Sequence, residues 1–293
     1  MGQKNNNNNN VAPVIKMMIQ LFASTSDDFI HHHGKKGAAR YLRITREGAQ
    51  WQTQLAKIVF ASSSEKKKND EQKIKQLGSY YVAYPKDRDA LRQEFELLQE
   101  LDECPGLAWI EDDEEVLKDI PGWSPDFKCA IYFPNDGVID SMAYAAALLQ
   151  HACEPNGATE GNVTFRGNAK VKCVSEHEQE GKEGAMVELE SGDVIYCQHV
   201  VMATGGLMQI PALNGLIRPC YSYLTHVPIS TVPDCQTSPN FFTWNFTHDW
   251  CFTNHAVRMS GEDHFSAYKD PQVQARCANL ARWTLERYKC HVE

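Results

Sequence analysis

The stretch HVVMATGG, residues 199–206, decides how the fold of this chain is interpreted. Its β-branched pair predicts a buried strand, and the small residues that follow predict a tight turn. Small residues and adjacent glycines let a backbone turn sharply while a flat or phosphorylated ligand lies against it. Because ligands of open α/β sheets bind beyond the carboxyl ends of strands, the turn is a candidate ligand site. The pair is Val200 and Val201, and the turn consists of Ala203, Thr204, Gly205 and Gly206.

Composition excludes several classes of protein. The net charge of −9 argues against a nucleic-acid-binding face, which needs clustered Lys and Arg. The 10 cysteines are scattered singly with no C-x-x-C pair, and no signal peptide precedes them. We therefore expect a cytoplasmic protein, or one from another reducing intracellular compartment. No apolar run approaches the length that crosses a bilayer.

The first half of the chain is predicted to be mainly helical. Residues 1–12 contain a run of asparagines and are expected to form a disordered tail. A short helix is predicted to end at Gly34, and a longer helix follows it. After a strand at 80–84, another helix begins near Asp87 or Asp89. The stripes expected to be buried are Tyr41, Ile44, Trp51, Leu55 and Ile58 in the long helix, and Leu91, Phe95, Leu98 and Leu101 in the next.

From Asp136 onward the pattern becomes that of a crossover unit. Val138 and Ile139 are extended, and Asp140 caps a helix. A strand near Val171 and a hairpin around Ser191-Gly192 then lead into the 199–206 stretch. The helix face expected to be buried is Met142, Ala145, Ala146, Leu149 and Ala152.

The last third has β character before a final helix. Strands are predicted at 221–227, 241–246 and 256–260. Asp270-Pro271 is typical of the start of a helix, with Val273, Cys277, Leu280 and Thr284 facing inward. The chain is thus expected to have an α/β fold with α+β character.

This order of elements resembles the middle of the FAD-dependent oxidoreductases of the D-amino-acid oxidase and glycine oxidase type. The segments that carry the resemblance are DGVID (136–140), NGA (156–158), Val171, ESGDVI (190–195), VVMATGG (200–206), Arg218-Pro219 with Tyr221 and Tyr223, RMSGEDHFSA (258–267) and IQLFASTSDDFIHHHG (19–34). The resemblance implies an incomplete FAD/NAD(P)-binding-type sheet domain with an antiparallel-sheet substrate domain. Residues 136–210 would form the cofactor side, and 13–135 and 211–293 mainly the substrate-side and helical parts.

The sequence departs from that family at both ends of the expected FAD site. The family begins with strand, G-x-G-x-x-G and helix, which hold the pyrophosphate, but this sequence contains no Gly-x-Gly. It also lacks the family's glycine-rich segment near the C-terminus. Three interpretations are therefore open: the sequence is a truncated gene model, a partner or neighbouring gene product supplies the rest of the site, or the chain is a degenerate relative.

The resemblance assigns cofactor residues and suggests substrate residues. The backbone at Val171 would lie against the adenine of FAD, and the turn from Ala203 to Gly206 would lie near the flavin or its phosphates. Arg258 is a candidate for binding a substrate carboxylate, the alternative being a pair with Glu262 or Asp263. Two further candidates have core or structural alternatives: Tyr223 over the flavin face and His264 as a general base.

Histidine and cysteine clusters give no clear metal site. His248, Asp249, Cys251 and His255 are close in sequence, but their spacing matches no known ligand pattern. No metal is therefore expected. The resulting hypothesis is an FAD-dependent oxidoreductase that oxidises a small amine or acid by hydride transfer to flavin and is incomplete or inactive as this chain. The alternative is a non-catalytic scaffold or interaction protein derived from that family.

Overall fold

The structure is a computed structural model, and it describes most of the chain. The described residues are 14–17, 26–62, 74–111, 117, 119–153, 163–179, 182–204, 220–229, 233, 238–253, 255–265 and 270–288. Four α-helices are assigned in these ranges: α1 (Ser26–Ser62), α2 (Arg88–Leu101), α4 (Ser141–Cys153) and α5 (Val273–Arg287).

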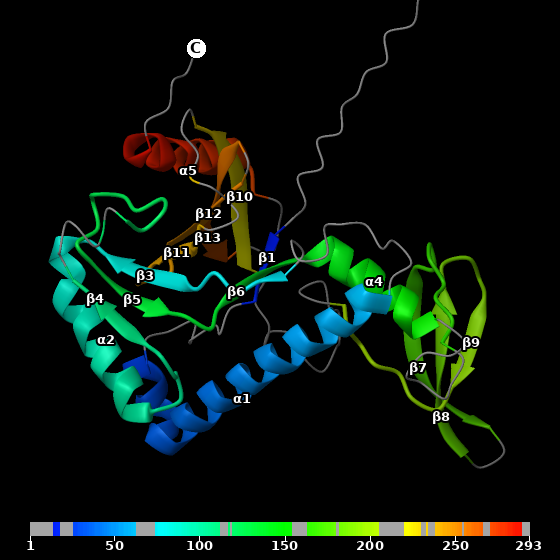
Figure 1. The fold of residues 1–293 in the computed structure, drawn as a ribbon. Coiled ribbons are helices and arrows are strands. Elements are labelled where there is room, and N and C mark those ends of the chain that lie inside the picture. The colour runs from blue at the N-terminus through cyan, green and yellow to red at the C-terminus, as the bar shows by residue number, and fades with distance from the viewer. Residues whose placement is uncertain are drawn as a thin grey trace, which may run out of the picture. The chain divides into compact units, whose positions relative to one another are not determined.

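The strands form three separate sheets. The first has the order β1-β6-β2, the second β10-β13-β12-β11-β3-β5-β4, and the third β7-β8-β9. Figure 1 labels these elements along the chain. The bounds are β1 (Val14–Met17), β2 (Ile74–Lys75), β3 (Ser79–Ala83), β4 (Ala108–Ile110), β5 (Cys129–Phe133), β6 (Gly137–Asp140), β7 (Val171–Gln179), β8 (Lys182–Leu189), β9 (Val194–Cys197), β10 (Cys220–Pro228), β11 (Asn240–Thr243), β12 (His248–Phe252) and β13 (Ala256–Phe265), with a short 3-10 helix η2 (Pro85–Asp87).

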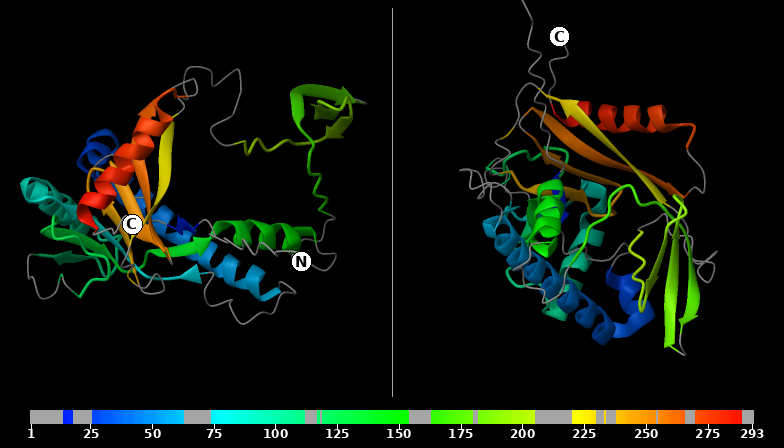
Figure 2. Two further views of the ribbon diagram at one scale, coloured as in Figure 1. Left: turned by 90° about the horizontal axis from the view of Figure 1, so that it is seen from above. Right: turned by 90° about the vertical axis from the view of Figure 1, so that its right-hand side faces the viewer.

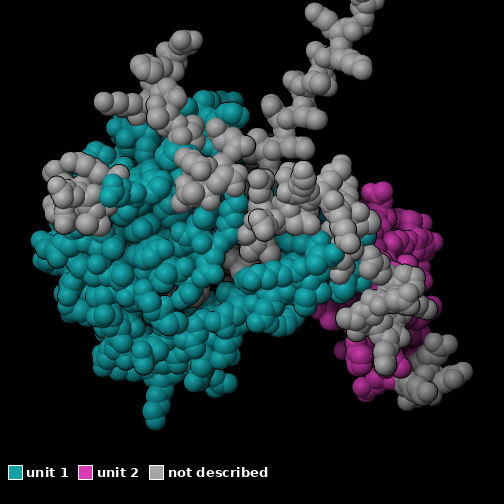
Figure 3. All heavy atoms as spheres, viewed as in Figure 1, with its two compact units in different colours: residues 1–151, 220–264, 268–293 teal, residues 152–219, 265–267 magenta. Residues whose placement is uncertain are grey.

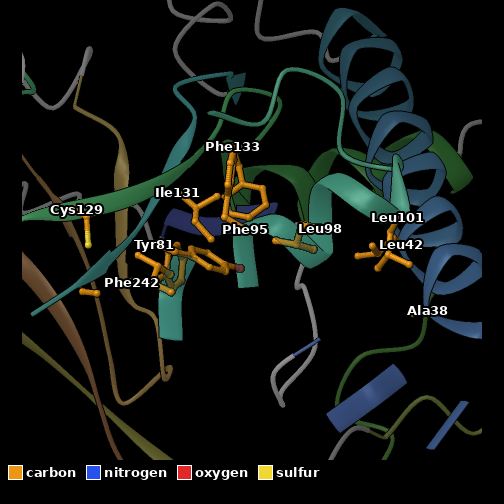
Figure 4. Packing of buried hydrophobic residues seen from close by; sticks show 12 residues of the cluster. Ala38, Leu42, Tyr81, Phe95, Leu98, Leu101, Cys129, Ile131, Phe133 and Phe242 are labelled. Carbon is orange, nitrogen blue, oxygen red and sulfur yellow. The ribbon is translucent and has the colours of Figure 1, made fainter. Parts of the chain in front are cut away.

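The central strands of the seven-stranded sheet are buried on both faces, because successive side chains along a strand belong alternately to two apolar clusters. On one face, Tyr81 and Phe242 pack with α1 and α2, as Figure 4 shows. We call this the α1/α2 face. On the other face, Val82 and Phe241 belong to a cluster that includes Leu280 of α5. We call this the α5 face, and Figure 2 shows α5 beside β10, with which it is in contact. Neighbouring residues of one strand thus point to opposite faces.

The predicted buried stripe of α2 is confirmed. Its four predicted apolar positions, Leu91, Phe95, Leu98 and Leu101, are all buried. Strand β3 and the hairpin of β8 and β9 also lie where they were predicted, and Gly192 takes the positive φ of 88° that the hairpin turn requires. The predicted break at Gly34 is present as a kink in α1, where φ is 69°.

The predicted buried face of α1 is wrong. Ile44 and Trp51 are 56% and 64% exposed, whereas Leu42 is fully buried. The helix carries two apolar stripes, and the structure buries the one that contains more small residues. Alanine lets the helix approach its neighbours closely, and this stripe packs first under the large sheet and then against α4. Its buried members are Ala38, Leu42, Ala56, Val59 and Phe60.

The predicted face of α4 is wrong for a similar reason. The helix and its cap are confirmed, since the Ala143 amide donates to Asp140 Oδ1 at 2.9 Å. Met142 and Leu149 of the predicted stripe are exposed, however, and only Ala147 is fully buried in the helix. α4 is apolar around most of its circumference, so periodicity could not choose a face. Contact with α1 through Ala143, Tyr144, Ala147 and Leu148 chooses it.

The buried strand predicted at Val200 and Val201 is also wrong. Neither residue lies in a strand, and Val201 is 89% exposed. A β-branched pair becomes a strand only when a neighbouring strand supplies backbone partners. No strand within the described ranges pairs with these residues.

The chain divides into two compact units, which Figure 3 distinguishes by colour. Unit 1 contains 1–151, 220–264 and 268–293, and unit 2 contains 152–219 and 265–267. Unit 1 holds the seven-stranded sheet, and unit 2 holds the sheet β7-β8-β9. The segment 136–210, expected on the cofactor side, contributes to both units.

Candidate functional site

Arg258 lies in the middle of β13, on the α1/α2 face of the large sheet. Its neighbours Val257 and Met259 are buried in the cluster of the α5 face. Because side chains alternate along a strand, Arg258 faces the other way. It lies opposite Cys251 of β12 in the antiparallel register.

The same register extends a row of side chains across the sheet on this face. Phe241 lies opposite Trp250, so Asn240 lies opposite Cys251. Asn240 is also the parallel partner of Ser79 in β3. We call Asn240, Cys251 and Arg258 the polar row. In the adjacent row, Ser260 donates a hydrogen bond to Asp249.

Arg258 does not pair with Glu262 or Asp263, which was the predicted alternative to binding a substrate carboxylate. Glu262 instead accepts from Arg276 at 3.4 Å and from Asn279 at 3.4 Å, and Asp263 is exposed. Within the described ranges, the Arg258 guanidinium has no hydrogen bond and no carboxylate partner. A half-buried guanidinium without an acid is a place where an anion can bind.

The positive charge of Arg258 acts on the imidazole of His226, which belongs to β10. Partial burial lowers the pKa of the His226 imidazole, and the positive charge of Arg258 lowers it further. The imidazole is therefore neutral near pH 7, and the positive charge in this part of the sheet comes from Arg258.

Tyr223 and His264 belong to a different cluster, centred on Asp270. The Tyr223 hydroxyl donates to Asp270 Oδ2 at 2.7 Å, and Arg276 Nε donates to the same oxygen at 2.7 Å. His264 Nε2 is 3.8 Å from that oxygen. The His264 ring stacks on Tyr223 at 5.6 Å between centroids and on Tyr221 at 5.8 Å.

The Asp270 cluster perturbs the pKa values of its members. The Gln272 amide, the Tyr223 hydroxyl and Arg276 all donate to the carboxylate and lower the pKa of Asp270 to about 2. Burial and the hydrogen bond to Asp270 raise the pKa of Tyr223 to about 12. Tyr223 is thus a neutral donor, and Asp270 an anion, across the physiological range.

The sheet separates Arg258 from the Asp270 cluster. Tyr223 is part of the apolar cluster on the α5 face, and Arg276 lies on α5. The side chains of β13 stop alternating regularly between the two faces at Gly261, whose φ is 150°, and Glu262, whose φ is 56°. A side chain on Gly261 would place its Cβ 2.4 Å from the Thr247 carbonyl oxygen, so only glycine fits there. The structure therefore brings Tyr223 and His264 together and leaves Arg258 on the opposite face.

The residues predicted to contact FAD lie in unit 2 where they are described. Val171, in β7, is 49% exposed, and Ala203 and Thr204 are exposed in a segment outside any strand. The backbone groups of Ala203 and Thr204 make no hydrogen bond to other described backbone groups. Gly205 and Gly206 lie outside the described residues.

The histidine and cysteine cluster of β12 does not converge on one point. His248 stacks on Trp283 of α5 at 4.8 Å between centroids, whereas Cys251 belongs to the polar row on the opposite face. Within the part of the chain that the structure describes, no three potential ligands lie together as a metal site would require.

Sequence reasoning missed three residues that the structure places in these clusters. Asn240 and His226 lie near Arg258 only because strands distant in sequence are paired, and no motif marks them. Asp270 was interpreted as a helix cap, and its side chain does accept from the Gln272 amide at 2.9 Å. Its pairing with Tyr223 and Arg276 could not be inferred from that role.

Comparison with protein families identifies the chain. The model of the FAD-dependent oxidoreductase family named DAO matches residues 26–289. Because this match spans most of the sequence, the chain belongs to that family. No curated protein sequence matches it.

Solved structures share the fold at low sequence identity. Iminodiacetate oxidase from Chelativorans sp. BNC1 is 17% identical with a TM-score of 0.55, covering 83% of this chain and 63% of that one. Glycine oxidase from Geobacillus kaustophilus is 15% identical with a TM-score of 0.57, covering 82% and 63%. NikD, an amino acid oxidase of nikkomycin biosynthesis, is 14% identical with a TM-score of 0.55, covering 92% and 65%.

These matches span a little under two thirds of each solved chain and show the fold alone. The mixed α/β architecture with a large mixed sheet and a separate antiparallel sheet is that of the family. As for membranes, none of the helices in the described ranges has the length and apolar composition needed to cross a bilayer.

Proposed function

We propose that this protein binds FAD and oxidises a small amine or amino-acid-like molecule. The observation that carries the proposal is the family match over residues 26–289. When bound, FAD would supply the two-electron oxidant that accepts a hydride from the substrate carbon. The residues of this chain would then hold the substrate and exclude water.

The predicted cofactor residues fit a flavin nucleotide in two respects. Val171 is 49% exposed, so an adenine could lie against the backbone at this position. Ala203 and Thr204 are small, exposed and free of described backbone partners, so their peptide groups could contact the nucleotide. Gly205 and Gly206 would complete that contact.

Arg258 is the proposed ligand for a substrate carboxylate. Its support is the absence of a carboxylate partner within the described ranges, together with its half-buried position. A carboxylate would form a charge-assisted hydrogen-bonded pair with the guanidinium. For Tyr223 and His264, the contacts with Asp270 favour a structural role over contact with substrate.

The experiment is to purify the protein with FAD and record its absorption spectrum. We expect a flavin band that survives gel filtration, and bleaching of that band when a substrate amine or amino acid is added without oxygen. A folded, colourless protein that ignores added FAD would instead support the non-catalytic scaffold.

A matched pair of variants tests where the flavin binds. Gly205→Val should lower the flavin retained per protein, because the turn is expected to need close backbone approach. Gly48→Val is the control, since a Cβ at Gly48 meets nothing within 4 Å. Equal flavin content in both variants would count against this placement.

A further inference from the structure

Helix α1 carries a regular stripe of apolar residues and one glycine on a side that is largely exposed. The positions alternate strictly between steps of three and four residues, which is the spacing of the contact positions in a coiled coil. Within the stripe, Ile44 is 56% exposed and Trp51 is 64% exposed. The stripe consists of Tyr41, Ile44, Gly48, Trp51, Leu55 and Ile58, and we call it the α1 stripe. Single exposed apolar residues need no explanation, but a continuous stripe marks a contact surface.

Gly48 is the position in the stripe that packing within the chain does not explain. It has ordinary helical backbone, so no positive φ requires a glycine there. A Cβ at Gly48 would meet nothing within 4 Å, so no neighbouring group requires one either. Glycine in the interior of a helix destabilises it relative to alanine. Its use is to let another backbone or a large side chain approach closely.

An antiparallel second copy of α1 supplies that large side chain. When Gly48 of one copy lies opposite Trp51 of the second, the two-fold axis between them fixes every other pair in the stripe. All six positions are then used, and each copy presents the same surface to the other, as a two-fold interface requires. The pairs are Gly48 with Trp51, Ile44 with Leu55, and Tyr41 with Ile58.

A parallel pair of helices does not fit the same stripe. It would place Trp51 opposite Trp51 and Gly48 opposite Gly48, so that one layer is overfilled and the adjacent layer is empty. Both defects weaken packing. The antiparallel pair has one large and one small residue in each of these layers, which is why it is the arrangement that the stripe favours.

The charges beside the stripe are compatible with the antiparallel pair. On one flank, Glu47 would face Gln54 of the second copy, and Arg40 would face Ala61. No two like charges meet along this flank, so electrostatic repulsion does not oppose the contact.

The size of the stripe fits a weak dimer. Its six positions extend over about 25 Å of helix. Two copies would bury on the order of 1,000 Å² in total, the lower limit for a specific interface. A dimer of this size dissociates on dilution. Dilute protein is therefore monomeric, and Ile44 is exposed there as it is in the single chain.

We propose that the α1 stripe is the contact surface of a homodimer in which two copies of this chain pair antiparallel, with Trp51 of each copy packed on Gly48 of the other. The inference goes beyond the proposed function, because it assigns an interface between copies and does not depend on flavin.

The experiment is sedimentation velocity on the full chain, from low micromolar to near-millimolar concentration. We expect the mass to rise from one chain to two and no further, because a two-fold contact is closed. Gly48→Trp adds apolar area to the stripe but fills the space that Trp51 of the second copy needs. It should weaken the dimer at least about 10-fold, the effect of overpacking one contact.

Two matched variants complete the test. Gly48→Trp combined with Trp51→Gly should restore the dimer, because each pair again has one large and one small residue. Gln50→Trp adds the same side chain at an exposed position of α1 outside the stripe, and it should associate as the wild type does. Thermal melts of dilute protein verify that every variant is folded.

Three results would overturn the inference. A wild-type chain that stays monomeric at all concentrations would leave the stripe to some other occupant. A dimer that Gly48→Trp strengthens would be non-specific apolar association. A folded double variant that fails to dimerise would reject the antiparallel register. None of these results bears on the proposed function, which flavin retention tests separately.

Discussion

Asp270 shows how one carboxylate organises its surroundings. Its two oxygens accept from the Gln272 amide, the Tyr223 hydroxyl and Arg276. These donors come from the start of α5, from β10 and from α5 itself. One buried side chain therefore ties the last helix to the edge strand of the large sheet.

This arrangement predicts an acid-sensitive fold. The pKa of Asp270 is lowered from 3.8 to about 2 in the folded protein, so its ionised form stabilises the fold. That contribution is fully present above about pH 4 and is lost as pH falls toward 2. Asp270→Asn should lower Tm at pH 7 and make Tm less dependent on pH between 4 and 2. Thermal melts at several pH values measure both effects.

Asp263→Asn is the matched control, because Asp263 is an exposed carboxylate nearby on β13. Its melting profile should follow the wild type throughout. If Asp270→Asn melts like Asp263→Asn at pH 7, the hydrogen bonds around Asp270 contribute nothing to stability.

The residue scale also shows a limit of sequence patterns. The segment RMSGEDHFSA (258–267) contains two substrate-residue candidates, Arg258 and His264, which lie on opposite faces of the sheet. Simple alternation would put both on one face, since six residues separate them. The positive φ values at Gly261 and Glu262 break that alternation. A glycine in a strand can signal such a break, but the direction of the chain after it depends on the neighbouring strands.

At the scale of single elements, the helices separate what periodicity can predict from what it cannot. α2 has one apolar stripe, and all four of its predicted residues are buried. α1 and α4 have more apolar positions than one face needs. The choice of face came from packing: Val59 of α1 belongs to one cluster with Ala147 of α4, and Leu42 of α1 belongs to the cluster of the large sheet.

The corrected face of α1 gives a direct test by paired substitution. Leu42→Ala should destabilise the protein by about 2–5 kcal/mol, because Leu42 is fully buried beside the large sheet. Ile44→Ala should change stability by less than about 0.5 kcal/mol, because Ile44 is exposed. Urea unfolding of both variants measures the difference. Equal losses would mean that Ile44 is covered in solution.

At the scale of the whole molecule, the two units differ in how much core they hold. The described part of unit 2 has one buried apolar side chain, Leu189, whereas the described part of unit 1 has two clusters on its large sheet and a third between α1 and α4. Local stability follows the amount of buried apolar contact. The sheet of unit 2 is therefore stabilised mainly by the hydrogen bonds between its strands.

Hydrogen exchange should reveal this difference. The amides of β12, which contains the buried Trp250, and of β13, which contains the buried Met259, should exchange only in global unfolding. Amides of β7, β8 and β9 should exchange faster by local opening. Mass spectrometry of peptides after timed labelling compares the two sets. Equal protection of both sheets would contradict the expectation, and added FAD that selectively protects β7 would support the proposed placement of Val171.

The sequence by itself determined the family, the order of most described elements and the hairpin that ends unit 2's sheet. Those features depend on local chemistry: turn residues, caps and single apolar stripes act within a few residues. Tertiary structure decided which faces of α1 and α4 are buried, that Val200 and Val201 form no strand, and that Asn240 and Arg258 share a row. These outcomes depend on pairing between segments far apart in the chain, and no local pattern encodes the register of one strand against another.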